Sequence, residues 1–286
     1  MARDSHGVLY VVATPIGNLD DMTLRALKVL KQVQLVAAED TRRTGILLRH
    51  FGIETSILSV HEHNESARVE RVTARLARGE SVALVTDAGT PGISDPGAAL
   101  VAAVRQAGFT VEPIPGACAV VAAISASGVS SQGFVFLGFP PIRLKDRKQW
   151  LDELARSSND RLVVFFEAPH KVRKTLEDLA KLVKRPIIVA RELTKLHEEF
   201  AQGTPDELLA KFQEPQGEFT VLVPPADASE IERDRPSDAE VVIVFGQIAE
   251  NTAFGSKREV ARAVGERLGM TAKEVYDIVE RSKLVN

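Results

Sequence analysis

The sequence has little cysteine, little charge imbalance and no long apolar run. Its single cysteine, Cys118, excludes an intrachain disulfide and a multi-cysteine zinc site, and it fits a reducing compartment. The 36 Lys and Arg against 39 Asp and Glu give a net charge of −3, so any RNA contact must come from local patches. The apolar run Val8–Ala13 is too short for a signal peptide or a membrane span. We therefore expect a soluble, cytoplasmic protein.

Two common nucleotide-binding motifs are also missing. The chain contains neither Gly-x-Gly-x-x-Gly nor Gly-x-x-x-x-Gly-Lys-[Ser/Thr]. These absences remove the usual sequence support for a pyrophosphate site on a doubly wound sheet and for a P-loop. A nucleotide-binding oxidoreductase is therefore disfavoured.

Short β-branched runs alternate with helical patterns in the first half of the 286 residues. This alternation predicts a mostly parallel sheet with helices on both faces. The expected strands are Val8–Ala13, Leu35–Ala38, Ser81–Thr86 and Val111–Ile114, and the expected helices include Ala67–Leu76 and Gly97–Ala107.

The same cycle restarts after a Pro-x-Pro-Gly turn at Pro113–Gly116. We expect an α/β protein with two α/β domains, residues 1–115 and 116–226, and a cleft between them. A polar, acidic linker at 227–240 precedes a small helical domain at 241–286. Its expected helices, Ser256–Val264 and Thr271–Ser282, resemble a helix-turn-helix, which would either bind nucleic acid or serve as a packing unit.

A loop rich in glycine and proline follows the strand at Ser81–Thr86. Residues 87–97 read Asp-Ala-Gly-Thr-Pro-Gly-Ile-Ser-Asp-Pro-Gly. Ligands bind at the carboxyl ends of parallel strands, and glycine lets a cofactor approach the backbone. Three glycines, two prolines and two aspartates in eleven residues favour a binding loop over a simple turn. The segment Ala13–Asn18 follows another strand and gives a weaker signal of the same kind.

Polar clusters follow other strands. Ala38–Thr44 holds two acids and two arginines, which form either a solvated ion-pair cluster or a phosphate-binding surface. His61–Glu65 lacks the distant Cys or His partner of a metal site, so a substrate-facing loop is favoured. Phe165–Lys171 and Arg191–Lys195 end two further strands, and their recurrence there favours a shared cleft over isolated ion pairs.

Eight segments in this order resemble the ribosomal RNA small subunit methyltransferase I family, which lies in the tetrapyrrole-methylase (class III methyltransferase) superfamily. The resemblance runs from about Val8 to Val223. It is carried by Leu9–Leu19, Ala37–Arg43, Val60–Glu65, Thr86–Gly97, Pro113–Ala117, Phe165–His170, Arg191–Lys195 and Gly217–Val223. The chain departs from the family at Cys118 and Ala168, where relatives usually carry serine.

The resemblance implies S-adenosylmethionine-dependent 2′-O-methylation of a cytidine ribose in the decoding centre of 16S ribosomal RNA. It also implies a homodimer, and we expect the assembled small subunit as the substrate. The cofactor contacts that it implies are Pro15, Asp87, Ala88, Gly89, Thr90, Ile93, Cys118, Ala119 and Phe166.

A ribose hydroxyl becomes a nucleophile only when its proton can move to a base. We expect Glu39, Asp40 or His61 to be that base, the two acids first, because their strand end should face the cofactor loop. The expected RNA contacts are Arg42, Arg43, His63, Asn64, Glu167, His170 and Arg191, and no metal is expected. The alternatives are a porphyrin or corrin methylase, which predicts a broad apolar cleft, and a non-enzymatic RNA-binding protein that uses the helical tail.

Overall fold

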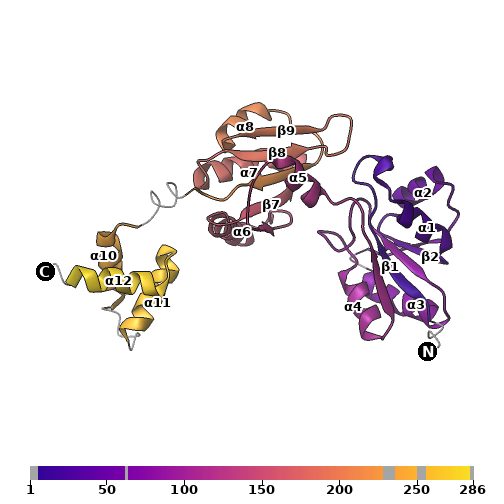
Figure 1. Ribbon diagram of the computed structural model, residues 1–286, viewed down its shortest axis with the longest axis horizontal. Coiled ribbons are helices and arrows are strands. Elements are labelled where there is room, and N and C mark those ends of the chain that lie inside the picture. Colours follow the sequence, from indigo (N-terminus) through magenta and orange to yellow (C-terminus); the bar gives the residue numbers. More distant parts are fainter. Residues whose placement is uncertain (1–5, 62–63, 228–235, 250–255, 284–286) are drawn as a thin grey trace. The chain divides into compact units, whose positions relative to one another are not determined.

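A computed structural model describes residues 6–61, 64–227, 236–249 and 256–283 (Figure 1). The chain divides into two compact units. One comprises Met1–Ala155 and Arg161–Pro224, and the other comprises Arg156–Asp160 and Pro225–Asn286.

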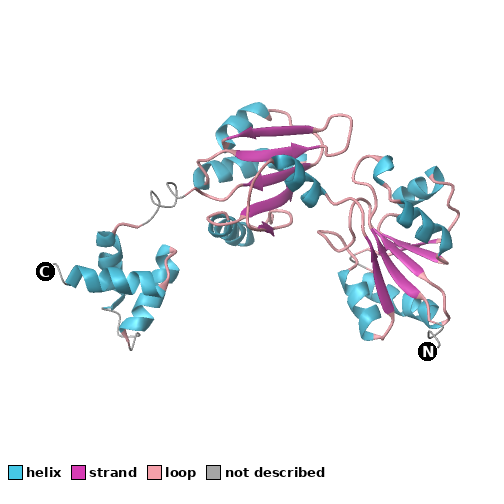
Figure 2. Ribbon diagram, in the orientation of Figure 1, coloured by secondary structure: helices cyan, strands magenta, loops and turns pink. Residues whose placement is uncertain are grey.

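The first half of the larger unit contains a five-stranded sheet in which every neighbouring pair is parallel (Figure 2). The strand order is β3-β2-β4-β1-β5. This confirms the parallel α/β prediction for the first half, with a short strand, β3, that the sequence patterns did not reveal. The strands are β1 (Val8–Val12), β2 (Leu35–Ala38), β3 (Ile57–Ser59), β4 (Val82–Val85) and β5 (Thr110–Ile114).

Helices cover both faces of this sheet because alternate strand residues bury on opposite sides. Val12 packs in the core formed with α1 (Leu24–Gln32) and α2 (Thr41–His50). Leu9 packs in a second core, formed with α3 (Glu65–Ala77) and α4 (Ala98–Gln106). A short 3₁₀ turn, η1 (Leu19–Asp21), follows the loop after β1.

The second sheet has the order β6-β7-β10-β8-β9, and only β6 and β7 pair in parallel. The expectation that the parallel cycle restarts is therefore wrong for most of this sheet. The return strand β10 inserts antiparallel between β7 and β8, and a short connection folds β9 back on β8. The strands are β6 (Phe134–Phe136), β7 (Leu162–Glu167), β8 (Ile187–Arg191), β9 (Glu199–Gly203) and β10 (Phe219–Val223).

The two faces of the second sheet are covered unequally. Trp150 of α6, Leu176 of α7 and Leu208 of α8 bury one face in a large core. On the other face α5 contributes Val120 and Ala123 to a smaller cluster, whose margin is only partly buried. The helices are α5 (Ala119–Ser127), α6 (Leu144–Ser157), α7 (Pro169–Leu182) and α8 (Pro205–Lys211).

The C-terminal residues that the structure describes, 236–249 and 256–283, form three helices around their own core, which includes Val264 and Ile278. The sequence predicted α11 (Lys257–Leu268) and α12 (Ala272–Lys283), which begin after Ser256 and Thr271, whose side chains accept the N–H groups of Glu259 and Glu274. It missed α10 (Asp238–Ala249), which starts inside the expected linker. No helix in the described part of the chain is long and apolar enough to cross a membrane.

Candidate active site

The loops after β1 and β4 are joined where the strands end. Thr14 donates its N–H to the Gly89 carbonyl at 2.9 Å, and Gly89 donates back to the Thr14 carbonyl at 3.1 Å. The buried Thr14 hydroxyl lies 3.3 Å from the Thr86 carbonyl. These bonds fix the glycine-rich loop beside β1, at the carboxyl edge where parallel sheets bind ligands.

Gly89 allows three loops to meet. Its φ of +80° lies in the left-handed region, and a Cβ there would lie 3.3 Å from the Ile16 Cγ2. The next residue, Thr90, donates its hydroxyl to the Ala117 carbonyl at 3.2 Å. The segment that leads from β5 into α5 therefore lies against both of the other loops.

An apolar wall continues from this junction into the second sheet. Phe166 packs edge-on against Phe136, with ring centroids 4.9 Å apart, and tilted against Phe139 at 5.5 Å. The residues that line this wall are only partly buried, so apolar surface is left for a ligand to cover. They are Ile16, Cys118, Ala119 and Phe166.

Carboxylates lie on the neighbouring strand ends. Asp40 donates its N–H to Asp87 Oδ1 at 3.1 Å, and Asp87 donates its N–H to Glu39 Oε2 at 3.3 Å. Arg43 Nη1 lies 3.3 Å from Asp87 Oδ2. The ends of β2 and β4 are thus linked through acidic side chains.

Glu39 and a further acid of the 87–97 loop, Asp95, have raised pKa values. Burial raises the pKa of Glu39, and the charges of Asp87 and Asp40 add to the effect. Burial, with the charges of Glu39 and Asp87, raises the pKa of Asp95 from 3.8 to about 6. We did not single out Asp95 from the sequence, although it is the second aspartate of the expected binding loop.

A cavity of about 320 Å³ opens beside these loops. It is called the α2 cavity here. Its lining combines the loop after β1, one face of α2, the start of the 87–97 loop and two charged residues of the second half. The lining residues are Thr14, Pro15, Ile16, Gly17, Leu19, Arg43, Thr44, Ile46, Leu47, His50, Thr86, Asp87, Ala88, Lys195 and Glu218.

Comparison with known proteins assigns this arrangement to a family. The sequence matches the profile of the Tetrapyrrole (Corrin/Porphyrin) Methylases over residues 8–209. It is 44% identical over 277 residues to "Ribosomal RNA small subunit methyltransferase I" of Synechocystis sp., covering 95% of this chain and 97% of that one. A protein of the same name from Escherichia coli O157:H7 is 44% identical over 244 residues, covering 83% and 84%. The chain belongs to the ribosomal RNA small subunit methyltransferase I family of tetrapyrrole methylases.

Solved structures share the fold of this methylase. The crystal structure of the methyltransferase CobJ superposes with a TM-score of 0.60 at 21% identity, covering 77% of this chain and 95% of that one. Uroporphyrin-III C-methyltransferase from Thermus thermophilus, complexed with S-adenosylhomocysteine, gives 0.53 at 19% identity, covering 76% and 96%. The expected fold class and the methyltransferase class are confirmed.

Most of the expected cofactor residues of the methylase lie together. Pro15, Asp87 and Ala88 line the α2 cavity, and Gly89 and Thr90 contact the other loops at the junction. Ile93 is 41% exposed on the same loop, with its N–H 3.3 Å from the Thr90 carbonyl. The remaining three, Cys118, Ala119 and Phe166, belong to the apolar wall.

The three expected bases differ in how far their side chains are already engaged. Asp40 caps α2, accepting the N–H groups of Arg42 and Arg43 at 2.7 and 3.4 Å. The His61 ring nitrogen Nε2 lies 2.9 Å from the Asn64 side-chain nitrogen, within its own turn. Glu39 accepts the Asp87 N–H at a long 3.3 Å, so its carboxylate is the least engaged of the three.

Asn64 and Glu65, at the end of the polar segment 61–65, have structural roles. Asn64 accepts the His61 N–H at 2.9 Å, and the buried Glu65 accepts the Leu100 N–H at 2.6 Å. Leu100 stands in the first turn of α4, where backbone donors lack helical partners. The segment therefore fixes the helix that follows the 87–97 loop. His63 lies outside the described residues, and those residues include no group of three or more His, Cys, Asp or Glu that could hold a metal ion.

Replacing Glu65 by alanine should destabilise the larger unit by about 1–3 kcal/mol, because the buried Leu100 N–H loses its acceptor. Glu65→Gln retains an acceptor oxygen, so its loss of unfolding free energy should be clearly smaller. Chemical denaturation of both variants measures the difference. Equal losses would show that the contact is not a hydrogen-bonded cap.

The three expected RNA contacts of the second half, Glu167, Arg191 and His170, have different environments in the structure. Glu167 is 2% exposed and binds the Ala168 N–H and the Thr175 hydroxyl, so its carboxylate serves the domain interior and is not available to RNA. Arg191 pairs with Glu199 at 3.2 Å. His170 remains exposed in the first turn of α7.

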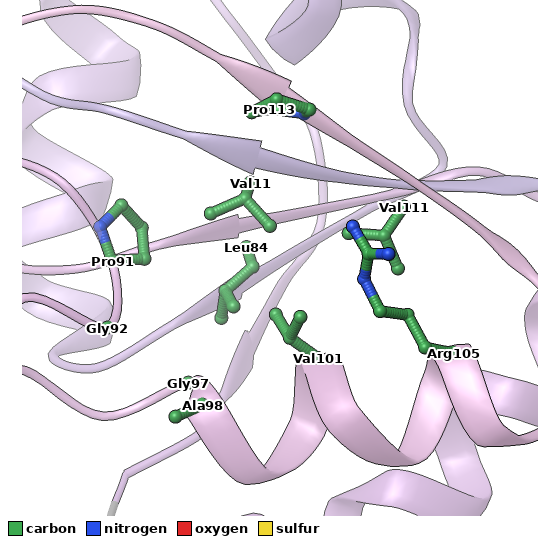
Figure 3. Close-up of a pocket in the computed structure, with 10 residues that line it drawn as sticks. All are labelled: Val11, Leu84, Pro91, Gly92, Gly97, Ala98, Val101, Arg105, Val111 and Pro113. Atoms are coloured by element: carbon green, nitrogen blue, oxygen red, sulfur yellow. The ribbon is translucent and has the colours of Figure 1, made fainter.

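A second cavity, of about 260 Å³, lies between the first sheet and α4 (Figure 3). Val11, Leu84 and Val101 point into it, and Pro91 and Gly92 border it from the loop. Arg105 is the one titratable residue of its lining, so the cavity offers little for chemistry.

Proposed function

We propose that this methylase transfers a methyl group from S-adenosylmethionine to the ribose 2′-hydroxyl of a cytidine in the decoding centre of small-subunit ribosomal RNA. The observation that carries the proposal is the 44% identity, over 95% of the chain, with a relative named Ribosomal RNA small subunit methyltransferase I. The finer target, a cytidine ribose, rests on the family resemblance of the site segments.

The residues at the loop junction fit the cofactor. Gly89 and Gly92 keep two positions of the loop free of side chains, and a Cβ at Gly92 would meet nothing within 4 Å. The partly buried wall of Ile16, Ala119 and Phe166 offers apolar contact for a nucleoside ring. When bound, the cofactor supplies an electrophilic methyl group on a sulfonium ion. Junction residues Pro15, Gly89 and Thr90, with this wall, would hold it.

The proton acceptor lies among the carboxylates at the same edge. A base works best when its pKa is close to the working pH, and burial brings the pKa of Asp95 to about 6. The charges of Glu39 and Asp87 contribute to that shift. We place proton removal at Asp95, with Glu39 beside it. The rest of the rate acceleration comes from holding the 2′-hydroxyl in line with the methyl group and from excluding water.

The test is methyl transfer from labelled S-adenosylmethionine to three acceptors: small subunits lacking the modification, their naked RNA, and a porphyrinogen. The proposal predicts label in RNA and none in the porphyrinogen. Label in the porphyrinogen alone would assign the chain to the chemistry named for its fold neighbours, which include a uroporphyrin-III C-methyltransferase.

The proposal includes a cytoplasmic homodimer that acts on the assembled subunit. The family resemblance supports the dimer, and the need for a folded RNA target supports the subunit, because a lone cytidine offers little to recognise. Sedimentation of the full-length chain measures the oligomeric state directly.

A further inference from the structure

Two cations from distant parts of the chain line the α2 cavity. Arg43 stands in the first turn of α2, paired with Asp87. Lys195 comes from the second half, where its Nζ lies 2.8 Å from Glu192 Oε1 and 3.0 Å from Glu218 Oε2. Burial acts to lower the pKa of Lys195, but its hydrogen bonds to both carboxylates outweigh it and raise the pKa. Lys195 is therefore a cation at every physiological pH.

The backbone around Lys195 is held in an unusual conformation. Glu192 and Thr194 adopt φ angles of +52° and +65°, which are costly for residues with side chains. A Cβ at Gly217 would lie 2.4 Å from Glu192 Cγ, so glycine is needed there to admit the carboxylate that holds Lys195. Strained backbone of this kind persists only where surrounding contacts hold it in place, and it is most frequent at functional sites.

The same segment contacts the loop after β1. Asn18 donates its N–H to the Thr194 hydroxyl at 3.1 Å. A Cβ at Gly17 would lie 2.4 Å from Lys195 Cγ, so the lysine stem runs directly over the Gly17 backbone. Lys195 is thereby directed to the cavity that Arg43 lines from the other half.

Apolar side chains flank these cations. Ile46 is 61% exposed and Leu19 is 39% exposed, and both line the cavity. The imidazole of His50, also in the lining, is braced edge-on by Phe51 with ring centroids 4.8 Å apart. Cations beside apolar and aromatic surface are the features by which proteins hold unstacked nucleotides of single-stranded RNA.

We propose that the α2 cavity binds one unstacked nucleotide of the RNA substrate, with its phosphate on Lys195 and Arg43 and its base against Ile46, Leu19 and His50. The inference rests on the proposed function. The phosphate replaces Glu218, whose side chain is 74% exposed, whereas Glu192, at 21%, stays to position the lysine. An anion here has a second source, the carboxylate of S-adenosylmethionine, because Pro15, Asp87 and Ala88 of the expected cofactor site also line this cavity. The other six expected cofactor residues, Gly89, Thr90, Ile93, Cys118, Ala119 and Phe166, do not line it, so we assign the cavity to RNA.

Affinity for unmethylated small subunits, measured over a range of salt concentrations, tests the proposal. Lys195→Gln should raise Kd about tenfold, as loss of one charge-assisted hydrogen bond does, and lower the salt slope by about 0.7. Arg43→Gln should act similarly, and Lys195→Arg should restore the slope. Glu218→Gln removes the competing carboxylate, so it should bind RNA at least as tightly as the parent protein.

Two matched controls lie outside the cavity. Lys211 pairs with Glu199, and Arg25 pairs with Glu112. Lys211→Gln and Arg25→Gln each remove one positive charge that is paired with a carboxylate, as the cavity variants do. Both should leave RNA affinity unchanged.

Three outcomes would overturn the inference. They are unchanged RNA affinity in both cavity variants, equal losses in the controls, or a loss confined to S-adenosylmethionine affinity, which would give the cavity to the cofactor. Each leaves the proposed function standing if the parent protein still labels a cytidine ribose. Absence of any RNA labelling by the parent protein would instead reject the proposed function.

Discussion

Replacing Asp95 by asparagine is expected to slow methyl transfer about 100-fold at pH 7.5, in line with the loss of a general base. The parent enzyme should lose activity as the pH falls through about 6, where the Asp95 carboxylate becomes protonated. Asp95→Asn should remove this inflection. Single-turnover rates between pH 5 and pH 9 measure both effects.

The same substitution should stabilise the protein at neutral pH. The pKa of Asp95 is about 6 in the folded chain and near 3.8 when unperturbed, so its protonated form is favoured by folding. That contribution is complete below about pH 4 and is lost as the pH rises through 6. Asp95→Asn should therefore raise stability at pH 7.5 by roughly 1 kcal/mol after solvent screening, or about 2–4 °C in Tm, and not below pH 4.

Asp152, which is exposed on α6, provides the control. Asp152→Asn removes the same charge far from the strand ends and should change neither the rate nor the pH profile. An Asp95→Asn enzyme with the parent's rate and inflection would show that the proton leaves by another route.

Gly89→Ala should weaken S-adenosylmethionine binding about 30-fold, equivalent to about 2 kcal/mol. The added Cβ would lie 3.3 Å from Ile16 Cγ2, so the Ile16 side chain, which forms part of the apolar wall at the expected cofactor site, must shift by a few tenths of an ångström. Calorimetric titration with S-adenosylmethionine and with S-adenosylhomocysteine measures the loss.

Gly108 is a matched control for backbone strain. Its φ of +82° is close to the +80° of Gly89, but a Cβ there would meet nothing within 4 Å. Both alanine variants should lose about 1–2 kcal/mol of stability through the left-handed angle, and only Gly89→Ala should lose cofactor affinity. Equal cofactor affinity in the two variants would contradict a cofactor site at the junction.

The sequence predicted the elements whose apolar periodicity is strong. β2 was located to the residue, because a continuous apolar run marks a strand buried on both faces. The helix α2 was missed because its first turn reads as a charge cluster, Thr41-Arg42-Arg43. Antiparallel insertion of β10 was missed because a strand's direction depends on its neighbours rather than on its own residues.

The part of the candidate site that the sheet topology brings together could be predicted from the sequence. Loops that follow parallel strands must meet at one edge of the sheet, so the 14–16 and 87–93 segments could be paired from the sequence alone. The sequence alone could not distinguish an acid that caps a helix from one whose carboxylate can accept a proton from the substrate. In the structure Asp40 and Glu65 accept backbone N–H groups, and the pKa of Asp95 is raised by burial and by the charges of Glu39 and Asp87. Lys195 and Glu218 are brought to α2 by tertiary contacts alone.

The most direct test of the account is the identity of the methylated nucleoside. Small subunits lacking the modification are incubated with the protein and labelled S-adenosylmethionine, and their RNA is digested to nucleosides for mass analysis. The account predicts label in 2′-O-methylcytidine at one decoding-centre position. Label on a base, or on a nucleoside other than cytidine, would contradict it.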